Sequence, residues 1–123
     1  MTARILLVED DRDLQELYAS MLEDEGYEIA QAYDGVDALE RLEEGGADLI
    51  VLDIILDVMM GDEFYMRIKQ DARFAGIPVV VVSVLPVERC QRLLDVDSTT
   101  AFLRKPFRRQ QLQEAIERGL GTR

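Results

Sequence analysis

The sequence contains no histidine and only one cysteine, Cys90, among its 123 residues. The absence of histidine excludes serine–histidine catalysis, histidine-ligated zinc and a role as a histidine phospho-carrier. A single cysteine excludes an intrachain disulfide and a thiolate metal site. Any metal in this chain must therefore be held by oxygen ligands, which favours hard cations of the magnesium or manganese type.

Positive charge and long apolar runs are also scarce. With 14 Lys and Arg against 25 Asp and Glu, the formal net charge is −11. This charge disfavours nucleic acid as a direct partner, because its phosphates would be repelled. No apolar run approaches the ~20 residues that a membrane helix needs, and the first residues lack a signal-peptide pattern. We therefore expect a cytoplasmic protein with no membrane partner.

Four short apolar segments each lead into polar side chains. The segments and the residues that follow them are 5–8 with Glu9 and Asp10, 49–52 with Asp53, 79–82 with Ser83, and 101–103, through Arg104, with Lys105. Unbroken apolar runs such as the first three are typical of strands buried on both faces of a parallel sheet.

These segments alternate with amphipathic stretches along the chain. We predict strands near residues 4–9, 27–32, 48–53, 78–83 and 100–104, and helices near 12–25, 35–45, 60–72, 86–95 and 107–119. Strict alternation predicts a single α/β domain over residues 1–123, with a parallel sheet and helices on both faces. In such sheets ligands bind beyond the carboxyl ends of the strands, so the polar residues above are expected at one edge.

The residue types at this edge suit phosphoryl chemistry. Glu9, Asp10 and Asp53 would meet if the first and third strands are neighbours. Carboxylates this close repel one another, and a divalent cation removes that conflict. An ionised Asp53 can attack a phosphoryl group to form an acyl phosphate, while the metal and the Lys105 ammonium neutralise the transferring group. The Ser83 hydroxyl can donate to a phosphoryl oxygen.

The same motifs resemble those of the CheY-like receiver domain of bacterial two-component response regulators, over about residues 4–120. The matching elements are the segment 5–11, Asp53 with Gly61 eight residues later, Ser83 after four valines, and Lys105-Pro106-Phe107. The resemblance implies a flavodoxin-like sheet with strand order 2-1-3-4-5. It also implies that Asp53 is the phosphoacceptor.

A magnesium site, which Mn²⁺ could also fill, follows from the same resemblance. Asp10 resembles a direct metal ligand, and Glu9 an acid that acts through a metal-bound water. The carboxylate of Asp53 and the backbone carbonyl of Ile55 resemble further ligands. Asp11 is either a helix cap or an additional metal ligand, because the family sometimes uses either of two acids here.

Ser83, Lys105 and Phe102 resemble the residues that bind the phosphoryl group and respond to it. In the family, phosphorylation changes the surface of the fourth helix, fifth strand and fifth helix. The implied function is a phosphoacceptor module, not a turnover enzyme, that is phosphorylated by a histidine kinase or phosphotransfer protein and acts on a downstream protein. Through the same surface the domain would be a monomer or a weak dimer.

Other functions remain open at this stage. A pseudo-receiver, with the same fold but a phosphorylation-independent interaction surface, is the alternative. A phosphatase with an aspartyl nucleophile is a third hypothesis, but such enzymes usually carry a second acid two residues later, where this chain has Ile55. Phe102 is either the aromatic switch or a packing residue of an edge strand.

Four positions near the predicted site set its expected phosphoryl lifetime. Position 57 is Asp where the family usually has Pro, and position 84 is Val where a small residue is usual. Ile55 and Leu85 are apolar where relatives that hydrolyse the acyl phosphate faster carry polar side chains.

A long-lived phospho-Asp53 is the expected consequence, because Ile55 and Leu85 offer no hydrogen bond to the in-line water and Val84 crowds its path. We expect a half-life of many minutes, with faster decay in Ile55→Asn and Leu85→Glu. Loss of the phosphoryl group is followed after donor removal, separately from the rate of phosphorylation. Decay of the unmodified protein within seconds, or no acceleration by either substitution, would contradict this prediction.

Overall fold

Strands and helices alternate through the computed structural model, which describes residues 2–54, 61–94 and 99–121. In chain order the elements are β1 (Arg4–Val8), α1 (Arg12–Asp24), β2 (Glu28–Ala32), α2 (Gly35–Gly45), β3 (Leu49–Asp53), α3 (Gly61–Lys69), β4 (Val79–Ser83), α4 (Val87–Leu93), β5 (Thr100–Arg104) and α5 (Arg109–Gly121). Within these described residues, no helix is long and apolar enough to cross a membrane.

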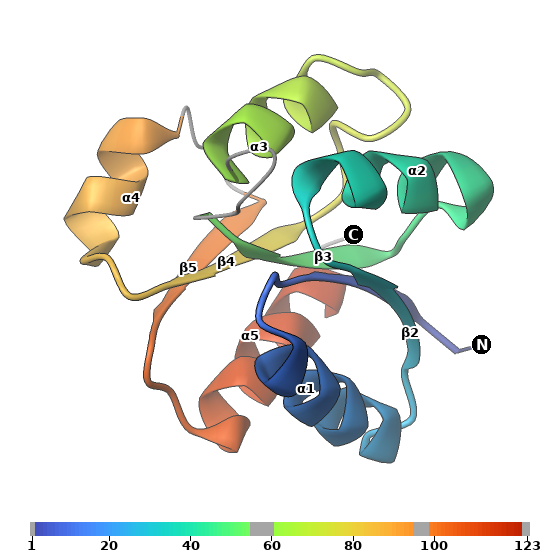
Figure 1. Cartoon of the computed structure of the whole chain (residues 1–123), viewed down its shortest axis with the longest axis vertical. Helices are drawn as coiled ribbons and strands as arrows, with labels where there is room; N and C mark the ends of the chain where they lie inside the picture. The colour runs from blue at the N-terminus through green and yellow to red at the C-terminus, as the bar shows by residue number, and fades with distance from the viewer. Residues whose placement is uncertain (1, 55–60, 95–98, 122–123) are drawn as a thin grey trace.

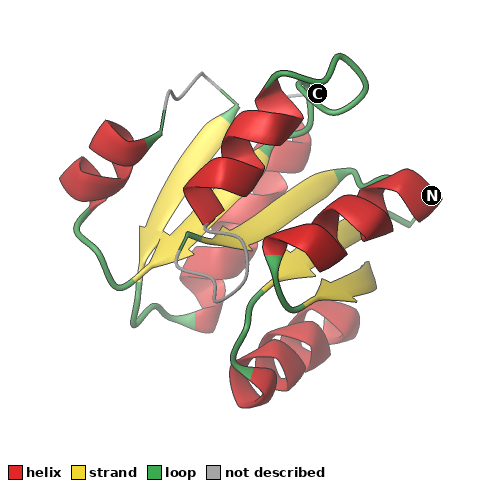
Figure 2. Ribbon diagram, turned by 45° about the horizontal axis from the view of Figure 1, so that its top comes forward, coloured by secondary structure: helices red, strands yellow, loops and turns green. Residues whose placement is uncertain are grey.

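The strands form one parallel sheet in the order β2-β1-β3-β4-β5. This confirms the predicted flavodoxin-like order and makes β2 and β5 the edge strands. Helices α2, α3 and α4 cover one face of the sheet, and α1 and α5 cover the other (Figure 1). The strands all point the same way, so their carboxyl ends lie along one edge (Figure 2).

The two faces of the sheet pack into two separate apolar clusters, which we call the α2–α4 cluster and the α1–α5 cluster. In β3, Ile50 and Leu52 belong to the α2–α4 cluster, whereas Leu49 and Val51 belong to the α1–α5 cluster. All four side chains are fully buried. Because successive residues of a strand point to opposite faces, burial on both faces requires an unbroken apolar run.

Asp11 is the N-terminal cap of α1. Its Oδ1 accepts hydrogen bonds from the backbone N–H groups of Asp13 at 3.0 Å and Leu14 at 3.1 Å. These amides have no partner within the helix, so a carboxylate acceptor at the cap stabilises the first turn. Of the two roles considered for Asp11, the structure therefore shows the cap.

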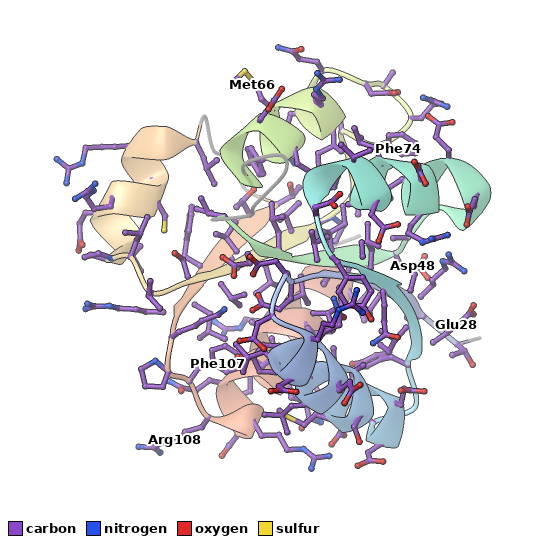
Figure 3. All side chains as sticks on the ribbon, viewed as in Figure 1. Glu28, Asp48, Met66, Phe74, Phe107 and Arg108 are labelled. Atoms are coloured by element: carbon purple, nitrogen blue, oxygen red, sulfur yellow. The ribbon has the colours of Figure 1, made fainter. Side chains whose placement is uncertain are left out.

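Three helices differ by two residues or more from the predicted ranges, and α1 ends one residue early, at Asp24. α3 and α4 are shorter than residues 60–72 and 86–95, and α5 begins at Arg109 instead of 107. After α3, the Asp71 carboxylate accepts the Arg73 N–H at 2.9 Å, a local bond that competes with helical pairing. Before α5, the ring of Phe107 packs on Tyr18 with centroids 5.3 Å apart. Figure 3 labels Phe107 beside Arg108, whose backbone N–H donates to Gln111 Oε1 at 2.7 Å at the start of α5.

Gly119 marks a close approach of α5 to the sheet, and its substitution tests that packing. A Cβ atom at this position would lie 2.6 Å from Cδ1 of the buried Leu49. We expect Gly119→Ala to lower the free energy of unfolding by about 1–3 kcal/mol, because overpacking outweighs the gain in helix propensity. Urea unfolding measures the change.

The control is Gly121→Ala at the end of the same helix, where a Cβ has no neighbour within 4 Å. It should leave stability nearly unchanged or raise it slightly. Equal stability of Gly119→Ala and the unmodified protein would show that α5 packs less closely on β3 than described.

Candidate functional site

The register of the sheet brings the acids of β1 and β3 together. Val8 pairs with Leu52, so Glu9 and Asp53 follow side by side at the carboxyl edge. Both are buried, with 2% and 8% of their surface exposed. Asp10 begins the loop that leads to α1, and the three residues offer carboxylate oxygens that all lie within 4.8 Å of one another. The predicted meeting of the three acids is present in the structure.

Lys105 directly follows β5, and its side chain crosses the end of β4 to reach this acid cluster. Its Nζ lies 3.2 Å from Asp53 Oδ2 and 3.2 Å and 3.3 Å from the two carboxylate oxygens of Glu9. The backbone N–H of Lys105 donates to the carbonyl of Ser83 at 2.8 Å, which holds the start of this loop against β4. The long lysine stem can then cross one strand to place its ammonium between two carboxylates.

The electrostatics of the cluster are unbalanced without a further cation. Burial, together with the hydrogen bond and negative charge of Asp53, raises the pKa of Glu9 from 4.5 to about 8. Burial lowers the pKa of Lys105, but the charges of Asp53 and Glu9 outweigh it, so the net shift is upward and the ammonium stays charged. The ammonium of Lys105 therefore does not by itself bring the pKa of Glu9 below neutral pH.

The donor set fits a divalent cation of the Mg²⁺ or Mn²⁺ type. Three carboxylates supply only hard oxygen ligands, which these ions prefer over nitrogen and sulfur. Asp10 is only partly buried, so the site is open on one side to waters, which Mg²⁺ usually keeps. The further ligand predicted at Ile55, like Asp57, lies outside the described residues.

Ser83 ends β4 beside this cluster. It is 2% exposed, and its Oγ accepts the backbone N–H of Leu85 at 3.1 Å. Leu85 packs against the α2–α4 cluster, and the side chain of Val84 is 62% exposed. The roles of these two residues in phosphoryl lifetime stay predictions.

Phe102 lies in edge strand β5, opposite Val81 of β4. Its side chain is partly buried and packs against the α2–α4 cluster, which also contacts Leu85. The contact is compatible with both roles considered for Phe102, and it places an aromatic ring on the same cluster as the loop that follows Ser83.

A buried glutamine at this edge was not singled out from the sequence. Gln15 Nε2 lies 2.8 Å from the carbonyl oxygen of Ala32, 3.1 Å from that of Glu9 and 3.3 Å from that of Leu7. Gln15 shares the buried face of α1 with Tyr18, Ala19 and Leu22. A polar residue within an otherwise apolar helical stripe was the available signal.

Comparison with known protein families identifies this arrangement. Residues 5–117 match the model of the response regulator receiver domain. The chain belongs to this receiver domain family. The match covers β2 to β5, all of β1 except Arg4 and most of α5, so the acid cluster and Lys105 lie within the matched range.

Two curated relatives show where such receiver domains occur. The polar-differentiation response regulator DivK of Brucella ovis is 29% identical over 98% of both chains. The sensor histidine kinase TmoS of Ectopseudomonas mendocina is 32% identical over 92% of this chain, which spans only 12% of the kinase. The family is a signalling module, in contrast to enzymes that turn over external substrates.

One similar solved structure is a receiver domain with a bound metal ion. The receiver domain of sensor histidine kinase PA1611 from Pseudomonas aeruginosa matches with a TM-score of 0.85 and 28% identity, over 98% of this chain and 99% of that one. Its structure has a magnesium ion coordinated in the active-site cleft.

The raised pKa of Glu9 predicts how stability depends on pH when metal is absent. Between the unfolded pKa near 4.5 and the folded value of about 8, the folded receiver binds one more proton than the unfolded chain. The stabilisation is therefore complete below the lower value and is lost as pH rises through the upper one, by up to about 1.4 kcal/mol per pH unit. Urea unfolding with a chelator, at pH values from about 5 to about 9, measures this slope.

Glu9→Gln is the matched variant, because it keeps the side-chain shape and cannot titrate. We expect a flatter pH profile for it, and a flatter profile for the unmodified receiver in excess Mg²⁺, since a bound cation favours ionised Glu9. Identical slopes for the two proteins in chelator would refute a proton held on Glu9.

Proposed function

We propose that this receiver domain is a cytoplasmic phosphoacceptor of two-component signal transduction. It takes a phosphoryl group from a phosphohistidine on a histidine kinase or phosphotransfer protein onto Asp53, with Mg²⁺ held by Glu9, Asp10 and Asp53. The observation that carries the proposal is a buried Asp53 carboxylate that has two further acids beside it and the Lys105 ammonium 3.2 Å away.

The side chains of the site divide the chemistry between them. A carboxylate oxygen of Asp53 forms the new P–O bond as the P–N bond to the donor imidazole breaks, and the donor nitrogen keeps the electron pair. Lys105 already contacts Asp53, so its ammonium is positioned to neutralise an oxygen of the transferring group. Bound Mg²⁺ would supply the remaining positive charge there. Glu9 and Asp10 serve this step by holding the cation.

The response to phosphorylation would begin at Ser83. Its Oγ accepts a hydrogen bond from the Leu85 N–H, and its side chain also hydrogen-bonds the buried Cys90 thiol, so the hydroxyl would turn from Cys90 to donate to a phosphoryl oxygen. Rotation of Ser83 toward the phosphoryl group would release that N–H. Leu85 and Phe102 pack against the same α2–α4 cluster, so movement of the loop changes the support of the aromatic ring. The α4–β5–α5 surface would then present the signal to a downstream protein, as a monomer or a weak dimer.

Phosphorylation of Asp53 is the direct test. Incubation with Mg²⁺ and a small phosphodonor should give a base-labile mass gain of one phosphoryl group, because an acyl phosphate hydrolyses in base. Intact-mass spectrometry before and after alkaline treatment measures it. The gain should be absent in Asp53→Asn and when Mg²⁺ is chelated.

Asp11→Asn is the control, because Asp11 caps α1 and asparagine caps helices equally well. This variant should be phosphorylated like the unmodified protein. Persistence of the mass gain in Asp53→Asn would rule out the assigned acceptor. Mg²⁺ binding without any phosphorylation, by donor or kinase, would favour the pseudo-receiver.

A further inference from the structure

Gln15 forms a fixed connection between α1 and the ends of two strands. Its side chain is fully buried, and its amide nitrogen faces carbonyls of β1, of β2 and of the acidic residue that follows β1. The shortest contact, at 2.8 Å, is to Ala32, whose carbonyl also accepts the Glu9 N–H at 3.0 Å. The Ala32 carbonyl therefore accepts hydrogen bonds from both Gln15 and Glu9, and Gln15 also donates to the Glu9 carbonyl directly.

The stability of the core does not by itself account for a glutamine at this position. Among the residues that the structure describes, Gln15 Oε1 has no hydrogen-bond partner although it is buried. An unsatisfied buried acceptor lowers stability, whereas leucine or methionine would fill a similar volume without that cost. What the glutamine provides, and an apolar side chain does not, is a donor to the carbonyls of Ala32 and Leu7 in the sheet and to the carbonyl of Glu9.

That carbonyl belongs to the peptide group that leads into Asp10. A peptide group is planar, so fixing the Glu9 oxygen also fixes the direction in which the chain enters Asp10. The hydrogen bond opposes a specific force, because Glu9 and Asp10 are repelled by each other and by Asp53. Without the bond, the loop could relieve the repulsion by turning its acids outward.

We propose that Gln15 is a positioning residue for the metal site, which it supports by tethering the Glu9 carbonyl to α1 so that Asp10 is presented toward Asp53. The inference rests on the proposed function for its metal and deepens it. Groups that orient metal ligands without touching the metal typically contribute about 10–100-fold to metal affinity. Gln15 would act in this way through the backbone of Glu9.

The test compares Gln15→Met with Leu22→Val. The first keeps a long side chain and loses the donor. The second trims a buried side chain of α1 about two turns away, which lowers stability and leaves the donor of Gln15 in place. Calorimetric titration measures Mg²⁺ affinity, urea unfolding measures stability, and NMR relaxation measures the order parameters of the Asp10 and Asp11 amides.

We expect Gln15→Met to bind Mg²⁺ roughly ten-fold more weakly and to lower the order parameters of these amides, while Leu22→Val changes neither. Gln15→Leu serves as the second donor-free variant if Gln15→Met folds poorly. Unchanged affinity and order parameters in a folded donor-free variant would overturn the proposal. Equal weakening in Leu22→Val would overturn it as well, because affinity would then follow stability alone.

The order parameters also separate this proposal from the proposed function. If the unmodified receiver binds no Mg²⁺, the metal site is wrong. The metal-free Asp10 amide then decides the tether by itself: a lower order parameter in Gln15→Met supports it, and an equal one overturns it.

Discussion

Mutual repulsion among the carboxylates of Glu9, Asp10 and Asp53 is the constraint on which the carboxyl edge of this receiver depends. Three acids with oxygens within 4.8 Å of one another are unfavourable unless positive charge is near. Lys105 supplies part of that charge, and the proton retained by Glu9 supplies another part when metal is absent. The site thus carries more negative charge than Lys105 balances, which favours a divalent cation. In the proposed function, an incoming phosphoryl group would share that positive charge.

The sheet makes this unfavourable arrangement possible. β1 and β3 are buried on both faces by well-packed helices, so their ends cannot separate to relieve the repulsion. Side chains alternate between the two faces along each strand. Glu9, just after β1, is therefore on the same face as Leu7, and Asp53, at the end of β3, is on the same face as Val51. This face is the one that α1 and α5 cover. Burial has the largest effect on the pKa of Tyr18 in α1 and raises it. The charges of Lys105, Glu9 and Asp53 also act on this pKa.

Ser83 continues the opposite face of the sheet. It follows Val79 and Val81 of the α2–α4 cluster, the cluster on which Leu85 and Phe102 also pack. The proposed chemistry at Asp53 and the proposed response therefore lie on opposite faces of the sheet. Ser83, at the same carboxyl edge, is the residue that would connect them. In the proposed response, a local change of charge would in this way reach the α2–α4 cluster.

The sequence alone determined the strands, their buried character and the acids, hydroxyl and lysine at their ends, because these features depend on local patterns of burial. The family motifs added the strand order. Tertiary packing decided the rest: Phe107 lies outside α5 and packs on Tyr18, and Lys105 contacts Glu9 across 96 residues of chain. The contacts of Gln15 were likewise invisible, since its three carbonyl partners are brought together only when α1 docks on β1 and β2. A local pattern records which side chains are buried, but which groups they meet is set by elements distant in the chain.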